Sequence, residues 1–143
     1  MWPLLLGISL GALLSLNLMR RSNLFDTGVF ITGGDIVKVA QRKYGAAVWL
    51  QPYEELADYW RDVNMYTAPT RLAGKRLLFV LPSRDKLIDP EDVRREALAQ
   101  QAAGNRLILL ERHQFGHIGT IIEETILFPR RVLGYIGQVE QQP

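Results

Sequence analysis

The chain has 143 residues, which is enough for one domain with a substantial apolar core. Its hydrophobic content of 48%, charged content of 22% and net charge of +2 are ordinary for a globular protein and exclude a disordered chain. The basic residues are scattered and form no stripe interleaved with aromatics, so we expect no nucleic-acid partner. Cysteine is absent, which excludes disulfides, thiolate catalysis and cysteine metal sites.

The first part of the chain allows two interpretations. Apolar patterning predicts a strand at Leu4–Gly7 and a helix at Leu10–Arg21. The alternative is a membrane anchor, because residues 2–19 carry no charge and Arg20 and Arg21 follow them directly. Glycines and polar residues within this stretch weaken the second interpretation, and a membrane association is not expected.

From residue 28 onward the sequence alternates between apolar runs and helical patterns. The apolar runs predict three further strands, at residues 28–32, 76–81 and 107–110. Helices are predicted between and after them, at residues 36–44, 90–102 and 119–138. Asp35 and Asp89 are suitable N-caps, and Pro129 should kink or divide the last helix. This alternation predicts an α/β fold, with a parallel sheet of about four strands covered by helices on both faces.

A segment at about residues 44–66 is rich in aromatic residues and predicts a small helical insertion into a single domain spanning residues 1–143. Its carboxylates Glu54, Asp58 and Asp62 recur every four residues, which indicates a solvated helix face. The aromatic side chains either pack this helix onto the sheet or line an apolar acyl pocket. The sequence pattern leaves both possibilities open.

Ser9 lies in a G-x-S-x-G pattern, Gly7-Ile8-Ser9-Leu10-Gly11, between the first predicted strand and helix. This context is typical of a nucleophile elbow, in which small neighbours on both sides permit the sharp turn that exposes the serine hydroxyl. The backbone N–H of Leu10 would then point to a developing oxyanion. A serine nucleophile also needs a base and an acid, which we expect at the carboxyl ends of the strands.

Asp85 follows the third predicted strand and His117 follows the fourth, which gives the chain order Ser, Asp, His that is expected of an α/β hydrolase. The chain resembles the second half, from the nucleophile elbow onward, of such a domain. The resemblance rests on the elbow pattern, on Arg84-Asp85-Lys86-Leu87-Ile88-Asp89-Pro90-Glu91, on Gly116-His117, and on Tyr66–Pro69 with Leu72–Lys75. It departs from the family at Pro82-Ser83, where a glycine is common.

The resemblance implies a serine hydrolase of carboxylic esters or thioesters that forms an acyl-serine intermediate. Ser9 would be the nucleophile, His117 the base, Asp85 the acid and the Leu10 N–H an oxyanion donor. His113 is an alternative base, although Gly116-His117-x-Gly119 fits the family better. Asp35 and Asp89 are alternative acids that are more simply explained as helix caps. The substrate would be a small acyl compound, and no cofactor or metal site is expected, in a cytoplasmic protein.

In the family the elbow strand is central, whereas here it is the first predicted strand. We therefore expect an N-terminally truncated domain whose elbow strand has a free apolar edge. Such an edge favours self-association or pairing with a completing chain. The alternative function is a non-catalytic half-domain that acts as an interaction module; a membrane-anchored protein is the third interpretation.

Overall fold

The computed structural model describes residues 3–44 and 72–141, together with residues 55, 58, 60, 61 and 64. Strands and helices alternate along this part of the chain. The elements are β1 (Leu4–Ile8), α1 (Leu10–Arg21), β2 (Thr27–Ile31), α2 (Ile36–Tyr44), β3 (Arg76–Pro82), α4 (Pro90–Ala102), β4 (Arg106–Arg112), α5 (His117–Ile122), η1 (Glu123–Leu127) and α6 (Pro129–Gln141). The predicted insertion at about 44–66 lies almost entirely outside the described residues.

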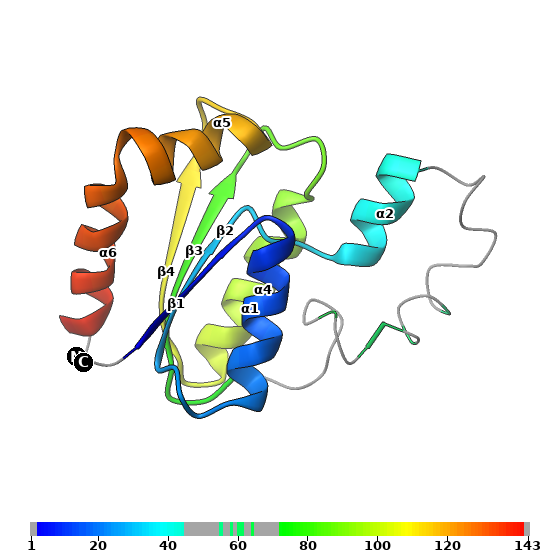
Figure 1. Ribbon diagram of the computed structural model, residues 1–143. Coiled ribbons are helices and arrows are strands. Elements are labelled where there is room, and N and C mark those ends of the chain that lie inside the picture. Colours follow the sequence, from blue (N-terminus) through cyan, green and yellow to red (C-terminus); the bar gives the residue numbers. More distant parts are fainter. Residues whose placement is uncertain are drawn as a thin grey trace.

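The described strands form one parallel sheet of four strands in the order β1-β2-β3-β4 (Figure 1). Helices α1 and α4 lie on one face of this sheet and α6 lies on the other (Figure 1). All five residues of β2 are buried, because the strand has neighbours on both sides and helices on both faces. The α/β class and the predicted parallel sheet are confirmed.

Two apolar layers hold the helices to the sheet. The larger layer packs α1 and α4 against side chains such as Phe30 and Phe79, whose ring centroids are 5.2 Å apart. The smaller layer lies between the sheet and α6, where Val132 packs with Val29 and Val80. Alternate residues of each strand therefore serve opposite layers, which explains why the strands are continuous apolar runs.

The uncharged stretch near the N-terminus is divided between β1 and α1, with a sharp turn at Ser9. Within the residues that the structure describes, no helix has the length and apolarity needed to cross a bilayer. The interpretation of residues 2–19 as a single helical anchor is therefore wrong for the described part of this stretch, because residues 4–8 pair with β2 as a strand.

The predicted helix boundaries follow from their caps. Asp89 accepts a hydrogen bond from the Glu91 N–H at 3.1 Å, and Pro90 occupies the first turn of α4. Gly104, with φ of 88°, provides the left-handed conformation that ends this helix. Phe128 separates the π-helical turn η1 from α6, which begins at Pro129, so the predicted division of the last helical segment is confirmed.

Candidate active site

Ser9 joins β1 to α1 in a backbone conformation that side chains rarely adopt, with φ of 53° and ψ of −122°. It occupies the N-cap position of α1, where a serine hydroxyl usually accepts a hydrogen bond from the helix backbone. Here the hydroxyl makes no such bond. Instead, Ser9 Oγ lies 2.9 Å from Nε2 of His117. The strained turn thus directs the hydroxyl away from the helix and toward an imidazole.

Gly7 makes this turn possible because α1 passes very close to β1. A Cβ atom at Gly7 would lie 2.6 Å from both the Ala12 Cα and the Gly11 carbonyl oxygen. At Gly11, by contrast, a Cβ would meet no atom within 4 Å. The expectation that the turn needs small neighbours on both sides is therefore wrong for Gly11. Of these two glycines, only Gly7 on β1 leaves no room for a Cβ atom, because α1 lies close to it.

His117 is the first residue of α5 and connects Ser9 to a buried carboxylate. Its Nδ1 lies 2.7 Å from Oδ2 of Asp85. The other carboxylate oxygen, Oδ1, accepts hydrogen bonds from the backbone N–H groups of Leu87 at 2.8 Å and Ile88 at 3.0 Å. Both oxygens of Asp85 are thus occupied, and the carboxylate is held in one orientation.

The protonation of this chain of groups follows from the environment of Asp85. Burial raises the pKa of the Asp85 carboxyl, but the hydrogen bonds from His117, Ile88 and Leu87 outweigh burial and bring the pKa below its usual value. At neutral pH the ionised carboxylate only accepts hydrogen bonds, so Nδ1 of His117 must carry the hydrogen. In the neutral imidazole Nε2 then has a free lone pair, which accepts the Ser9 hydroxyl hydrogen.

The alternative residues considered from the sequence have different partners. His113 Nδ1 lies 2.9 Å from Ser83 Oγ, not beside Ser9. Asp35 caps α2, with Oδ1 accepting from the Val37 and Lys38 N–H groups at 2.9 and 3.2 Å. Asp89 caps α4. The structure therefore brings together Ser9, His117 and Asp85. The alternative acids Asp35 and Asp89 instead cap helices.

Solved structures of several hydrolytic enzymes resemble the fold of this chain. No family model and no curated protein matches the sequence. An esterase from Pyrococcus furiosus superposes with a TM-score of 0.65 at 17% identity, over 94% of this chain and 52% of the esterase. A prolyl endopeptidase superposes with a TM-score of 0.73 at 20% identity, over 97% of this chain and 22% of the peptidase. A puromycin-hydrolysing peptidase from Mycobacterium tuberculosis superposes with a TM-score of 0.66 at 15% identity, over 94% of this chain and 22% of the peptidase.

The chain has the α/β-hydrolase fold. It spans about half the length of the esterase that it matches. In an α/β-hydrolase fold, ligands bind beyond the carboxyl ends of the parallel strands. Ser9 follows β1, Asp85 follows β3 and His117 follows β4, so all three lie at that end of this sheet.

Two further features surround Ser9. Leu10 is the first residue of α1, so its backbone N–H lies in the first turn, where no intrahelical acceptor is available. An apolar hollow of about 60 Å³ also lies beside the serine. Its lining residues are Ser9, Leu10, Leu13, Gly34, Ile36, Val39, Leu87 and Ile88. These residues come from three separate parts of the chain, which explains why no local sequence pattern predicts the hollow.

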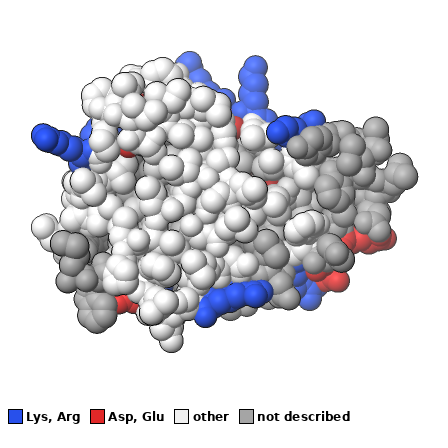
Figure 2. Space-filling view, viewed as in Figure 1, with Lys and Arg blue, Asp and Glu red and all other residues white. Residues whose placement is uncertain are grey.

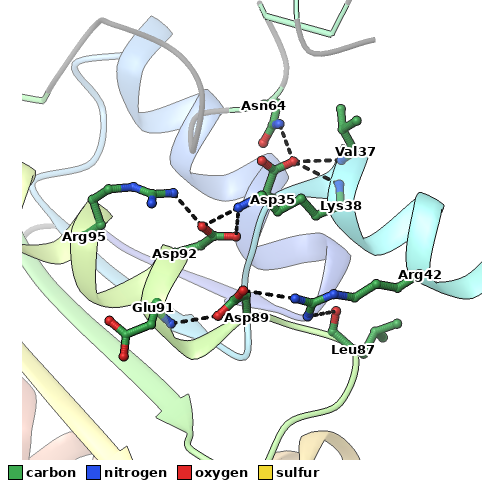
Figure 3. A network of polar contacts seen from close by, with 10 residues as sticks. All are labelled: Asp35, Val37, Lys38, Arg42, Asn64, Leu87, Asp89, Glu91, Asp92 and Arg95. Carbon is green, nitrogen blue, oxygen red and sulfur yellow. Dashed lines mark hydrogen bonds and ion pairs between the residues drawn. The ribbon is translucent and has the colours of Figure 1, made fainter. Parts of the chain in front are cut away.

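Polar contacts attach α2, which forms one wall of the hollow, to α4 and its N-terminal end (Figure 3). Lys38 Nζ lies 2.6 Å from Asp92 Oδ1, and Arg42 Nη2 lies 3.0 Å from Asp89 Oδ2. Asn64 donates a hydrogen bond to Asp35 at 2.8 Å, at the start of α2. These contacts hold α2 in place, with Ile36 and Val39 in the wall of the hollow. Within the described residues, no group of three or more metal-ligating side chains occurs.

Proposed function

We propose that the chain is the part of a serine hydrolase that carries the catalytic triad, with Ser9 as nucleophile, His117 as base and Asp85 as acid. The observation that carries this proposal is the continuous hydrogen-bonded path from the Ser9 hydroxyl through His117 to Asp85. The strained backbone at Ser9 supports it, because such strain concentrates at functional sites. The α/β-hydrolase fold is consistent with it.

The reaction follows from the protonation state of the three groups. Ser9 Oγ attacks the acyl carbon while its proton moves to Nε2 of His117, and the carbonyl π electrons move to the carbonyl oxygen. Asp85 stabilises the imidazolium that forms, through its bond to Nδ1. Collapse of the adduct breaks the bond to the leaving group, which takes the Nε2 proton, and leaves an acyl-Ser9. Water repeats these steps, releases the acid and restores the Ser9 hydroxyl.

The surroundings of Ser9 support an acyl substrate. The Leu10 N–H is suitable as a donor to the oxyanion, and the positive end of the α1 dipole adds to it. The hollow beside Ser9 would hold a small apolar part of the substrate. We favour carboxylic esters and thioesters because an alkoxide or thiolate leaves more readily than an amine. The matched esterase is consistent with this choice.

Covalent labelling by a fluorophosphonate tests the proposal, since such a probe phosphonylates an activated serine. The wild type should be labelled and the Ser9→Ala variant should not. Ser83→Ala is the matched control, because Ser83 also lies 2.9 Å from a histidine nitrogen and should be dispensable. Labelling that survives in Ser9→Ala, or that disappears in Ser83→Ala while the protein stays folded, would contradict the assignment.

A second candidate function is a non-catalytic interaction module. The exposed leucines along β1 favour it, because Leu4 is 40% and Leu6 is 49% exposed. A folded wild-type protein that fluorophosphonate does not label would support this function and would count against the hydrolase.

A further inference from the structure

The helix that carries His117 is buried through polar rather than apolar side chains. Elements α5 and η1 form one continuous helical run from His117 to Leu127, since the backbone stays helical at their junction. We call this run the base helix. Its buried residues are Thr120, Glu123 and Glu124. Ile121 packs, partly buried, on the smaller apolar layer. The other apolar residues are 41–70% exposed, namely Ile118, Ile122, Ile126 and Leu127. Apolar packing therefore contributes little to holding this helix on the sheet.

Two ion pairs hold the far end of the base helix. Both glutamates of η1 are buried, and the surface over this orange part of the ribbon is mostly uncharged (Figures 1 and 2). Glu124 is 1% exposed, and its Oε1 accepts a hydrogen bond from Nε of Arg112 at 2.5 Å. Arg112 ends β4, so this bond joins the helix directly to the sheet. Glu123 Oε1 accepts a hydrogen bond from Nη2 of Arg131 in α6 at 3.1 Å. The far end is thus fixed by charge-assisted hydrogen bonds.

The two ends of the base helix make different contacts. At its start, His117 is hydrogen-bonded to Ser9 and to Asp85. Glu124 follows seven residues later, which is about two turns and roughly 10 Å along the helix axis. The contacts at the start fix where the helix begins, and the bond at Glu124 fixes the direction in which it runs. A tilt of the helix would move the His117 ring relative to Ser9.

We propose that Arg112 is a positioning residue, which sets the direction of the base helix through Glu124 and so keeps Nε2 of His117 within hydrogen-bond distance of Ser9. We call Arg112 and Glu124 the anchor pair. This inference rests on the proposed function, because it assigns a role in the reaction. The Arg112 guanidinium contacts Glu124 and Tyr135 rather than the reacting groups, so it acts through His117. A displacement of about 1 Å at a catalytic group is enough to lower a rate by about 100-fold.

The chemistry of the anchor pair favours a role in positioning over a role in net stability. A buried ion pair gains little stability over apolar side chains of similar volume, because the loss of hydration opposes the attraction. What the pair adds is a bond between particular atoms. Burial lowers the pKa of the Arg112 guanidinium, but the interaction with Glu124 outweighs burial and raises the pKa above its usual value. The guanidinium therefore stays charged, and its planar shape gives the bond a defined direction.

Replacing both members of an ion pair tests the proposal in the 143-residue chain without leaving a buried charge alone. The double variant Arg112→Met with Glu124→Leu should lower kcat for a p-nitrophenyl ester by about 100-fold and keep KM within about threefold, because proton transfer is misaligned while the substrate still binds. The matched control is Arg94→Met with Glu111→Leu. Glu111 precedes Arg112 on β4, but its partner Arg94 lies in α4 and not in the base helix. The control should keep kcat within about threefold.

Nuclear magnetic resonance of ¹⁵N-labelled histidine gives a second measurement that does not need catalysis. The chain contains two histidines, so two imidazole rings are observed, and His117→Ala assigns them. The resonances of His117 depend on its hydrogen bonds to Ser9 and Asp85. They should shift when the anchor pair is replaced and should match the wild type in the control. Thermal unfolding checks that both double variants are folded.

The outcomes separate this inference from the proposed function. A folded anchor-pair variant with the kcat and the His117 resonances of the wild type would overturn the inference and leave the proposed function intact. Equal losses of kcat in the two double variants would also overturn it, because the anchor pair would then act only as any ion pair does. A wild type that neither hydrolyses esters nor reacts with fluorophosphonate would overturn the proposed function and, with it, a role of Arg112 in the reaction. The His117 resonances would still show whether the anchor pair positions the ring.

Discussion

The molecule contains two hydrogen-bonded pairs of serine and histidine, Ser9 with His117 and Ser83 with His113. The oxygen–nitrogen distance is 2.9 Å in both. In the first pair, the remaining ring nitrogen of the histidine bonds to the buried carboxylate of Asp85. In the second pair the bond is exposed. Equal distances therefore accompany very different environments.

A carboxylate that interacts with His113 of the second pair serves another partner. Glu111, two residues before His113, accepts two hydrogen bonds from Arg94, at 2.6 and 3.0 Å. Ser83 Oγ also lies 3.2 Å from the Arg112 carbonyl oxygen, so its hydroxyl is shared with the backbone. A serine and a histidine in contact thus do not define a catalytic site. The third group, the strained turn and a backbone donor must be present as well.

Replacing each histidine gives the largest expected difference between the two pairs. His117→Ala removes the base of the proposed triad and should lower kcat for a p-nitrophenyl ester by about 10⁶-fold. His113→Ala should leave kcat within about threefold of the wild type, since no step uses this ring. Steady-state ester hydrolysis measures both. Comparable losses in the two variants would mean that the pairs are not functionally distinct.

Replacing the two carboxylates tests the role of the third group. Asp85→Asn keeps the shape of the side chain but favours the wrong tautomer of His117, and it should lower kcat by about 10⁴-fold. Glu111→Gln changes the carboxylate near the second pair and should leave kcat unchanged. The same ester assay measures the effect, and thermal unfolding checks that each variant is folded. An Asp85→Asn enzyme with normal kcat would remove Asp85 from the mechanism.

Most of the fold was predictable from local sequence patterns. The apolar runs coincide with the four strands to within one or two residues at each end, and the caps Asp35 and Asp89 mark the starts of two helices. These features are local, because a strand or a cap depends on residues close together in the chain. The order and spacing of Ser9, Asp85 and His117 also allowed the structure to be tested at three named positions.

Features that depend on distant contacts were not predictable. The hollow beside Ser9 combines side chains that lie up to 79 positions apart, from Ser9 to Ile88. Thr32 has a φ of 55°, yet nothing in the sequence indicates this unusual backbone conformation. The different steric demands at Gly7 and Gly11 arise from the path of α1 across β1. For the hollow and for the two glycines the cause is tertiary packing, which a single sequence does not encode locally.

Gly7 and Gly11, two positions before and after Ser9, test how strongly packing fixes the strained turn at Ser9. The pair of Ser83 and His113 has no such turn. Gly7→Ala puts a methyl group 2.6 Å from the backbone of α1, which must move, and should destabilise the fold by about 1–3 kcal/mol. Gly11→Ala has free space in a helix and should be neutral or stabilising by up to about 1 kcal/mol. Urea unfolding measures both. Equal free energies of unfolding would show that α1 does not constrain the turn.

The smallest expected effect is on the free energy of unfolding, and it concerns the ion pair between Glu111 and Arg94. The hydrogen bond from Arg94 lowers the pKa of Glu111 more than burial raises it. Because the folded pKa lies below the unfolded one, the stabilisation is present above the usual carboxyl range and is lost as the pH falls through the folded pKa. Near neutral pH, Glu111→Gln should destabilise the protein by only about 0.2–1 kcal/mol, since both side chains are partly exposed and Arg94 keeps Glu91 as a partner.

The pH dependence of this small effect distinguishes an ion pair from a packing contact. The difference in unfolding free energy between wild type and Glu111→Gln should shrink toward zero in strong acid, where Glu111 is protonated in both folded and unfolded chains. Urea unfolding at several pH values measures it. A difference that stays constant with pH would show that Glu111 acts through packing. Its carboxylate would then not be held by Arg94, and the contrast between the two serine–histidine pairs would rest on the burial of Asp85 and on the strained turn at Ser9.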